Sequence, residues 1–451
     1  MKTIIVIILG FLFGKPAYSQ EKKELVFKID SIVTPLVNTN NFSGSILVTQ
    51  NGNELFSKAY GKMSQEFELD NNLNTKYFIA SVSMIFTSAA VMKLNESGLI
   101  KLDDKVSKFL PHYQHGNKLT IGDLLSQRSG IPAIGTNGNV NYDSITKFEH
   151  NSEELYAYFK DYELLFEPGS KYNHGRSDYI ILAYIIELIT GKSFGEYLQD
   201  EIFTPLGMAN TGHFSTEKEI IKNLAKGYAP KNLYDLETAF QIDWSSKTGH
   251  GSIYSTVYDL RKFAQAALDN DFLTKDSWNK IFQNHGDNVG YGWFIRKHLH
   301  RDLFQMNGRS PGFSSYLGIY PEENLIVIVL SNNYISLPAS LGGSIAAMTM
   351  NEPFEGLNLT DKTLTHNFAE KLIGSYKFDG DFYSPNIELE ITFEEGYLIS
   401  DWGGLVPIDK GNENFLEYIL RTYWSSIEFV EGENGEITQM KYDDHIGLKV
   451  K

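Results

Sequence analysis

Residues 42–60 read FSGSILVTQNGNELFSKAY, a stretch in which apolar and polar side chains alternate on both sides of an Asn51-Gly52 pair. Alternation with a period of two is typical of a β-strand, and Asn-Gly is a dipeptide that suits a tight hairpin turn. We therefore predict two paired strands near the start of the chain.

A second hairpin is predicted far downstream, from strand-like segments at 314–320 and 325–330. Between the two hairpins the sequence is mostly helical, with candidate helices at 81–95, 179–190 and 255–268. Strands at both ends of a domain with helices between them favour one antiparallel sheet covered by helices. The fold class that we expect is α+β.

The last hundred residues differ from the rest of the chain. A polar, turn-rich segment at 351–368 reads as a linker, and short alternating stretches bounded by Gly, Asn or Asp follow it. This pattern predicts a small all-β domain at 369–451. The larger domain then occupies residues 20–350.

The N-terminus has the features of an export signal. Lys2 precedes an apolar run at 4–13, and small residues lead to a cleavage site near Ser19. We predict a signal peptide at 1–19, with a retained membrane anchor as the alternative. Because the run has only about ten residues, it is too short to span a bilayer, and we expect no stable membrane span.

Composition limits the chemistry. The 451 residues include no cysteine, which excludes a thiol nucleophile and a cysteine-ligated metal, and we expect no metal site and no cofactor. The formal charge of −16 repels polyanions, so we expect no nucleic-acid partner. Any reaction must use oxygen, nitrogen or histidine groups.

Ser81 is the first candidate nucleophile. It lies in FIASVSMIFT (residues 78–87), at the start of a nearly all-apolar helix. Backbone N–H groups and the helix dipole at such a position favour a developing negative charge.

Several motifs accompany Ser81 in order along the chain. They are Thr120-Ile121-Gly122-Asp123-Leu124-Leu125, Ser129-Gly130-Ile131-Pro132, Phe166-Glu167-Pro168-Gly169, Pro205-Leu206-Gly207-Met208, Gly251-Ser252-Ile253-Tyr254-Ser255-Thr256, Tyr291-Gly292-Trp293 and Pro311-Gly312-Phe313-Ser314-Ser315. With these motifs the chain resembles the serine β-lactamase and penicillin-binding-protein family, in particular its class C-like and DD-peptidase-like esterase branch. The resemblance implies a β-lactamase/transpeptidase-like fold and acyl transfer through a serine ester, in a bacterial protein that is periplasmic or secreted.

The family's Ser-x-x-Lys box is altered here. Ser81 is present, but Met84 stands where the resemblance implies a lysine. A thioether neither takes up the serine proton nor carries a positive charge. The packing role expected for Met84 is therefore that of a core residue.

The Tyr-x-Asn box falls on His174-Gly175-Arg176. In one interpretation His174 faces Ser81 and serves as general base in place of the missing lysine and tyrosine. In the other, the site has drifted and His174 is a polar loop residue. Arg176 replaces the asparagine by a permanent cation.

The Lys-Thr-Gly box falls on Met306-Asn307-Gly308, followed by Arg309. The resemblance implies an oxyanion hole made by the backbone N–H groups of Ser81 and Arg309, which does not depend on side chains. Gly308, Arg309 and Arg176 are the expected ligand-binding residues, because two arginines suit a carboxylate. The alternative is that both arginines are solvated.

Three further motifs are not expected to be functional. Lys247-Thr248-Gly249 spells the third box but directly precedes a different landmark of the family. Gly308-Arg309-Ser310-Pro311-Gly312 spells a nucleophile elbow, but a strand and not a helix is predicted after it. His298 and His300 have no third metal ligand nearby in sequence.

Two functions remain open at this point. The chain is a serine hydrolase that acts on an ester, peptide or amide through Ser81 and His174, or it is an inactive relative that binds or regulates. The departures at Met84, His174, Arg176 and Met306 favour the second function, and the retention of Ser81 and Gly308 favours the first. In either case the expected partner is a small molecule or a peptide or cell-wall-derived ligand, with a carboxylate as the favoured recognition group.

Overall fold

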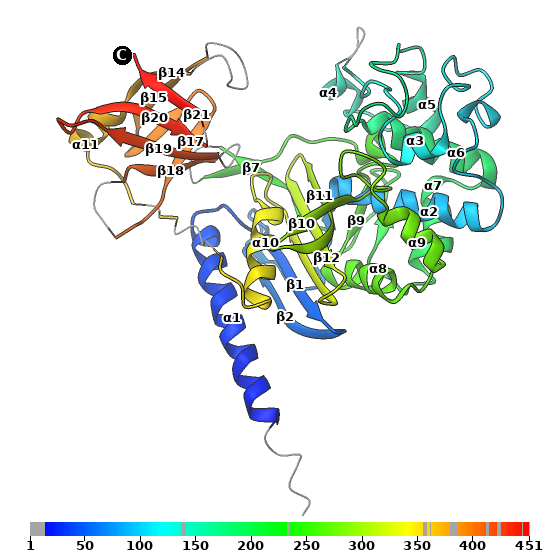
Figure 1. Ribbon diagram of the computed structural model, residues 1–451, viewed down its shortest axis with the longest axis horizontal. Coiled ribbons are helices and arrows are strands. Elements are labelled where there is room, and N and C mark those ends of the chain that lie inside the picture. The colour runs from blue at the N-terminus through cyan, green and yellow to red at the C-terminus, as the bar shows by residue number, and fades with distance from the viewer. Residues whose placement is uncertain are drawn as a thin grey trace, which may run out of the picture.

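The computed structural model describes residues 14–136, 141–231, 235–354, 359–360, 362–378, 387–411, 415–421, 425–443 and 445–450. A larger α+β domain precedes a small C-terminal barrel (Figure 1). The predicted fold class is confirmed for both parts.

One antiparallel sheet organises the larger domain, with strand order β10-β11-β12-β13-β1-β2. The first hairpin and the last hairpin of the domain lie side by side, because β1 pairs with both β2 and β13 and Leu47 lies opposite Ile328. The sheet predicted from the two hairpins is therefore confirmed. Its strands are β1 (Gly44–Gln50), β2 (Asn53–Tyr60), β10 (Phe294–His298), β11 (Arg301–Ser310), β12 (Phe313–Tyr320) and β13 (Leu325–Ser331).

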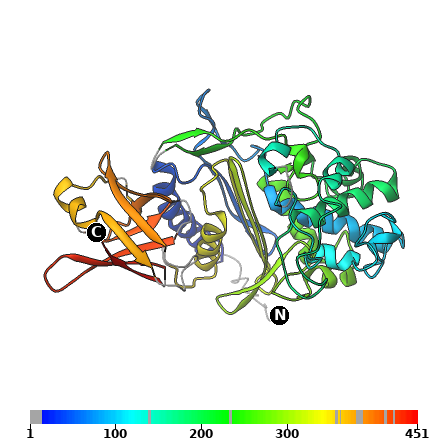
Figure 2. The same cartoon turned by 90° about the horizontal axis from the view of Figure 1, so that it is seen from above.

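Both faces of the sheet are covered, since neighbouring residues of a strand point to opposite faces. Ile46 and Val48 pack in a cluster with α1 (Gly14–Asn38) and α10 (Pro338–Thr349), whereas Leu47 belongs to the large core under the helical region. Seen from above, the sheet stands between these two layers (Figure 2). The central strands can therefore be apolar on both faces, as the fully buried β12 and β13 are.

The helical region lies between β2 and β10 in sequence. The three predicted helices are present, and capping residues such as Thr256 fix where they start. The helices are α2 (Met84–Glu96), α3 (Ile121–Leu125), α4 (Tyr142–Ile145), α5 (Ser152–Ala157), α6 (Arg176–Thr190), α7 (Phe194–Leu198), α8 (Val257–Asp269) and α9 (Lys275–Phe282), with the short turns η1 (Ala80–Ser83), η2 (Val106–Lys108), η3 (Gln199–Phe203) and η4 (Trp244–Lys247). Short strands join them: β3 (Lys62–Ser64), β4 (Leu69–Asp70), β5 (Tyr77–Phe78), β6 (Gly212–His213), β7 (Tyr228–Pro230), β8 (Leu236–Thr238) and β9 (Ile253–Ser255).

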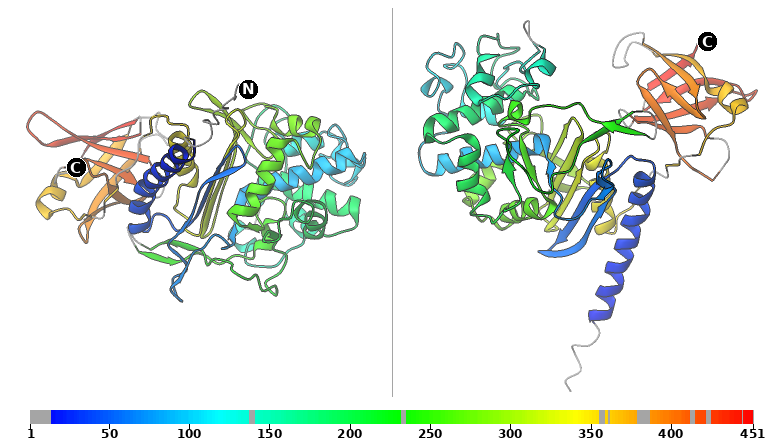
Figure 3. Two further views of the ribbon diagram at one scale, coloured as in Figure 1. Left: turned by 90° about the horizontal axis from the view of Figure 1, so that it is seen from below. Right: turned by 180° about the vertical axis from the view of Figure 1, so that it is seen from behind.

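Helix α1 runs along the sheet and its first turns project beyond it (Figure 3). Most of the predicted signal peptide, residues 1–13, lies outside the described residues, and Gly14 to Ser19 form the first turns of α1. Cleavage near Ser19 stays a prediction. Among the residues described, no helix is both long and apolar enough to cross a membrane.

The C-terminal domain is a closed antiparallel barrel of eight strands around its own apolar core. Helix α11 (His366–Leu372) begins inside the segment predicted as a linker, of which 355–358 and 361 lie outside the described residues. The domain boundaries stay predictions. The barrel strands are β14 (Gly374–Phe378), β15 (Glu388–Glu394), β16 (Tyr397–Ser400), β17 (Gly403–Pro407), β18 (Glu417–Leu420), β19 (Ser425–Glu431), β20 (Ile437–Tyr442) and β21 (His445–Lys449).

The barrel packs on the end of α1. Val406 and Ile419 of the barrel form a small apolar cluster with Leu36. Beside it, the buried Arg421 donates from Nε to the Asn41 side-chain oxygen at 2.8 Å and from a terminal nitrogen to the Asn40 carbonyl at 3.1 Å. These contacts join the barrel to the connection between α1 and β1.

Candidate active site

Ser81 lies in the turn η1, between β5 and α2. Ala80, directly before it, has φ of +47°, a left-handed conformation that costs about 1–3 kcal/mol for a residue with a side chain. The turn is held because the Ile79 N–H donates to the Ile253 carbonyl at 3.0 Å and the Val82 N–H donates to the Ile79 carbonyl at 3.1 Å. Ser81 is partly exposed, and within the described part of the chain its hydroxyl makes no hydrogen bond. Backbone strain at this point fits a functional serine.

Strand β11 approaches Ser81 closely at Gly308. A Cβ at position 308 would lie 2.7 Å from the Ser81 nitrogen and 2.4 Å from the Ile79 oxygen, so only glycine fits. Ser315 on β12 fixes the same corner by donating from its hydroxyl to the Ile79 carbonyl at 2.6 Å. Arg309 is the next residue of β11, so its backbone lies beside this contact between Gly308 and Ser81. The oxyanion hole of Ser81 and Arg309 N–H groups stays a prediction that this approach favours.

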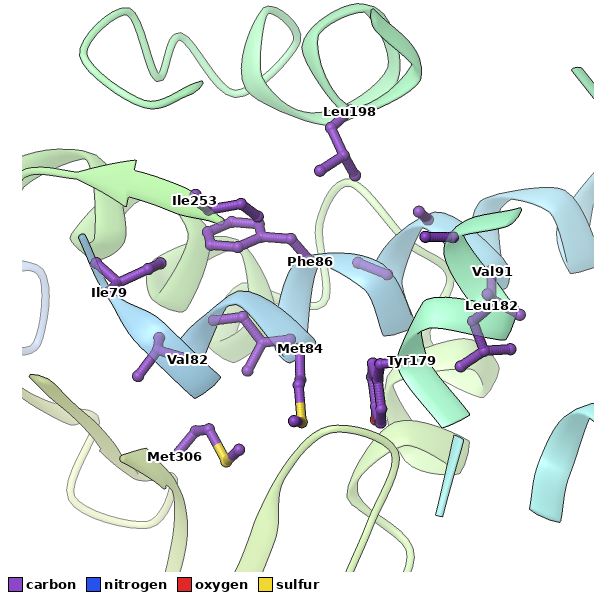
Figure 4. Packing of buried hydrophobic residues seen from close by; sticks show 14 of the residues in the cluster. Ile79, Val82, Met84, Phe86, Val91, Tyr179, Leu182, Leu198, Ile253 and Met306 are labelled. Atoms are coloured by element: carbon purple, nitrogen blue, oxygen red, sulfur yellow. The ribbon is translucent and has the colours of Figure 1, made fainter. Parts of the chain in front are cut away.

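The floor of the site is apolar. Met84 is 1% exposed and Met306 is 2% exposed, and both belong to the main core. Figure 4 shows the two methionine side chains on the same side of α2, in the space toward β11, with Tyr179 nearby. Neither methionine can act as a base, so a proton acceptor for Ser81 must come from another element.

His174 precedes α6 and is held by an aromatic residue two positions earlier. Its Nδ1 lies 3.0 Å from the Tyr172 hydroxyl, and its ring stacks near Phe294 with centroids 6.5 Å apart. The ring keeps contact with solvent, although protein surrounds it on most sides. Burial, with a smaller contribution from the Arg176 charge, lowers the pKa of His174 below 6.5. The imidazole is therefore neutral at pH 7 and able to accept a proton.

Tyr172 connects His174 to Gln127. Burial raises the pKa of Tyr172, so its hydroxyl keeps its proton, and that hydroxyl lies 3.5 Å from the Gln127 side-chain oxygen. The Gln127 amide nitrogen donates to the Gly175 carbonyl at 2.9 Å, which turns its oxygen toward Tyr172. This chain allows Nδ1 of His174 to donate to Tyr172 while Nε2 stays without a proton. Sequence reasoning missed both Tyr172 and Gln127. The signal that could have found Tyr172 is its hydroxyl group, two positions before His174.

Arg176 is the first residue of α6. Its guanidinium lies 3.9 Å from the centre of the Tyr142 ring, close enough for a cation–π contact. No ion pair joins it to a carboxylate within the described chain. Its charge therefore remains available to a ligand.

The side chain of Arg309 contacts a different residue from the side chain of Arg176. Because Gly308 faces Ser81, the next side chain of β11 points to the opposite face. There Arg309 donates from Nε to the Tyr334 carbonyl at 2.7 Å, and its guanidinium lies 4.7 Å from the Tyr334 ring centre. No contact among the described residues joins Arg309 to Arg176. The expectation that the two arginine side chains act together is therefore corrected, and only the backbone role of Arg309 is retained.

The motifs set aside in the sequence have structural explanations. Strand β12 follows Gly312, so Ser310 is not at a strand-to-helix elbow. His298 is paired through Nδ1 with the Tyr320 hydroxyl at 2.8 Å. No group of three potential metal ligands occurs in the described ranges.

Comparison with known proteins places the chain in one family. A family model described as beta-lactamase matches residues 29–340. A penicillin-binding protein of Bacillus subtilis (strain 168), PbpX, is 29% identical over 64% of this chain and 71% of its own length. Another penicillin-binding protein of the same strain is 24% identical over 92% of this chain and 96% of its own length.

Solved structures share the fold. The octameric penicillin-binding protein homologue from Pyrococcus abyssi has a TM-score of 0.68 at 24% identity, covering 94% of this chain and 99% of its own. The D-amino acid amidase from Ochrobactrum anthropi SV3 has a TM-score of 0.63 at 19% identity, covering 74% of this chain and 99% of its own. At these identities the likeness shows the fold alone.

Proposed function

The chain belongs to the β-lactamase family and is serine-hydrolase-like, and from this premise we propose that it hydrolyses an ester or amide by acyl transfer through Ser81, with His174 as the base. The observation that carries the proposal is the tethered, neutral imidazole of His174. Its Nδ1 is occupied by Tyr172 and its Nε2 makes no hydrogen bond to the described residues. A base in this state takes the place of the family's lysine, because position 84 is a methionine in this chain.

The proposed reaction runs in two steps. His174 Nε2 takes the Ser81 proton while the serine oxygen bonds to the acyl carbon, and the tetrahedral oxyanion lies at the N–H groups of Ser81 and Arg309. The imidazolium then returns the proton to the leaving alcohol or amine as its bond to the acyl carbon breaks. Water, deprotonated by His174, attacks the acyl-enzyme, and the acid leaves as the Ser81 hydroxyl regains a proton.

The proposed ligand is a small molecule or a peptide or cell-wall-derived compound with a carboxylate. Arg176 supplies a cation without an acidic partner in the described chain. An aromatic pocket of about 310 Å³, lined in part by Phe78, Trp244 and Phe313, adjoins the segment that leads to Ser81 and suits an apolar group. The names of the relatives, penicillin-binding proteins and a D-amino acid amidase, are consistent with such a ligand.

We propose export to the periplasm or the medium, after removal of residues 1–19. The apolar N-terminal run and the cell-envelope names of the relatives support this location. Mass measurement of the mature protein from its native host tests the cleavage site.

A second candidate function is that of an inactive binding protein. The observation that favours it is that buried, uncharged methionines, Met84 and Met306, stand at two of the family's motif positions. Such a protein would bind the same ligand without turnover.

The two functions differ in covalent chemistry. We expect a fluorophosphonate to add to Ser81, and p-nitrophenyl ester hydrolysis to fall at least about 1,000-fold in Ser81→Ala. His174→Gln should lower kcat by about 100-fold or more, while His112→Gln, which changes an exposed histidine, should leave it unchanged. Absence of both an adduct and Ser81-dependent turnover would exclude the hydrolase and favour the binding protein.

A further inference from the structure

A buried lysine lies near Arg176 and has no acidic partner among the described residues. Lys247, at the end of η4, is 9% exposed. Its Nζ donates to the Tyr142 hydroxyl at 3.3 Å and makes no ion pair within the described ranges. Burial of an unpaired ammonium is costly, so a second favourable interaction is expected for it.

Arg176 shares the same aromatic ring. The Tyr142 ring centre lies 5.2 Å from the Lys247 Nζ and 3.9 Å from the Arg176 guanidinium carbon. Two cations on one ring repel each other, and the ring quadrupole offsets only part of that repulsion. An anion between them would relieve it.

His250 completes the cluster. It is 5% exposed, and its Nε2 has no hydrogen-bond partner among the described residues. Burial, followed by the charges of Lys247, Arg176 and His174, lowers the pKa of His250 well below 6.5. Three basic groups, Lys247, Arg176 and His174, therefore act on the His250 ring.

The segment that carries Lys247 and His250 is fixed beside the Ser81 helix. Thr87 of α2 donates from its hydroxyl to the Gly249 carbonyl at 2.6 Å, and the Ile253 N–H donates to the Ser83 hydroxyl at 3.2 Å. On its other side, a Cβ at Gly249 would lie 2.1 Å from the Tyr179 carbonyl oxygen of α6, where the φ of +85° also requires glycine. The basic cluster is thus built between α2, which directly follows the Ser81 turn, and α6, which begins at Arg176.

The charge of the whole chain does not explain this cluster. The chain has 56 acidic and 40 basic residues, so a shortage of carboxylates is not the reason that these cations are unpaired. We propose that Arg176 and Lys247, with His250 Nε2 as an additional donor, form an anion-binding subsite that holds a carboxylate or phosphate group of the ligand over the Tyr142 ring. This inference rests on the proposed function in one respect, which is that the anionic group belongs to the ligand that binds at Ser81.

The test measures binding in the Ser81→Ala protein, so that it is independent of acyl transfer. Calorimetric titrations use hippurate, its uncharged methyl ester, and glycerol 1-phosphate as probes. We expect at least one anionic probe to bind and the methyl ester to bind at least about tenfold more weakly, because a charge-assisted hydrogen bond is lost. Preference for hippurate identifies a carboxylate subsite, and preference for glycerol 1-phosphate identifies a phosphate subsite.

Matched variants locate the binding. Lys247→Met and Arg176→Gln should each weaken binding of the anionic probe at least about tenfold, whereas Lys147→Met, which removes an exposed cation just after α4, should leave affinity unchanged. Imidazole NMR provides a readout that loss of fold does not mimic, because a bound anion should raise the pKa of His250. The proposal of this subsite would be overturned if neither anion bound, or if the methyl ester bound as tightly as the anions. It would also be overturned if Lys147→Met lost as much affinity as Lys247→Met. None of these outcomes bears on whether Ser81 reacts.

Discussion

The interface between the two domains and the region around Tyr142 each bury a basic side chain. Arg421 at the interface is 2% exposed, and two oxygens of the connection after α1 accept hydrogen bonds from it. Lys247 near Tyr142 is 9% exposed and donates to the Tyr142 hydroxyl, while a second cation, Arg176, lies on the same ring. The first cation is satisfied by the protein, and the second is not satisfied by the described residues.

The difference shows how to distinguish a buried cation that stabilises the fold from one that binds a ligand. The planar guanidinium of an arginine matches fixed oxygens, and such a site lowers the free energy of the folded state. A buried cation that lacks these oxygens destabilises the free protein and becomes favourable only when a ligand supplies the charge. Substitutions at the two sites should therefore have opposite effects on stability.

The largest effect is expected at the domain interface. Arg421→Met should lower the free energy of unfolding by about 3 kcal/mol, because the buried side-chain oxygen of Asn41 and the partly buried carbonyl of Asn40 each lose a charged donor. Urea unfolding measures it, with Arg261→Met, at a surface arginine that donates to the Gly52 carbonyl, as the control. If both variants lose equally little, Arg421 does not hold the interface and the comparison fails.

A smaller effect of opposite sign is expected at Lys247. Lys247→Met should leave the free protein unchanged or raise its free energy of unfolding by about 1 kcal/mol, because a buried unpaired charge is replaced by an apolar side chain of similar length. Thermal unfolding measures this change, and Lys147→Met should stay within about 0.5 kcal/mol of the parent. Strong destabilisation by Lys247→Met would show that Lys247 has a structural role.

The shared ring should contribute less. Tyr142→Leu removes both cation–π contacts, each worth about 0.5–1 kcal/mol at a partly exposed site, and should weaken binding of the anionic probe several-fold. Tyr142→Phe keeps the ring and loses only the hydroxyl, so its affinity should fall less. Calorimetry on the pair measures the contribution of the ring, and equal losses would assign the effect to the hydroxyl instead.

The smallest effect concerns pH. The pKa of His250 is below 6.5 in the folded state, so the unfolded chain takes up this proton first as the pH falls. Its contribution to stability is present above pH 6.5 and decreases as the pH falls below that value. Urea unfolding at pH 7.5 and 5.5 should therefore show a weaker pH dependence in His250→Gln. In Lys247→Met the dependence should also weaken, because one cause of the low pKa is gone; an unchanged dependence in both would contradict the cluster.

Much of the fold follows from local pattern. Alternation around Asn51-Gly52 predicted the first hairpin, and β1 and β2 confirm it. The helix expected at 81–95 is present as η1 and α2, although the sequence did not reveal the left-handed Ala80 that turns the chain before Ser81. A strained backbone depends on surrounding contacts, here Ile253 and Gly308, that lie far away in sequence.

The candidate site divides in the same way. Motif order singled out Ser81, His174, Arg176 and Gly308, and the burial of Met84 agrees with the packing role expected for it. Sequence reasoning wrongly paired the side chains of Arg176 and Arg309, because the strand register that turns Arg309 away was not known. It also set aside Lys247, which reaches the cluster only through the folding of η4 against α4.

The sequence by itself determined the α+β fold, the second β domain and the position of Ser81 at the start of a helical segment, because periodicity and motif spacing are local properties of a chain. The tertiary structure alone decided which cations share a neighbourhood. Arg176, Lys247 and His250 come from a helix start, a short turn and a loop. These three side chains interact only because α2 and α6 hold that loop between them, and electrostatic energy depends on distance in space and not along the chain.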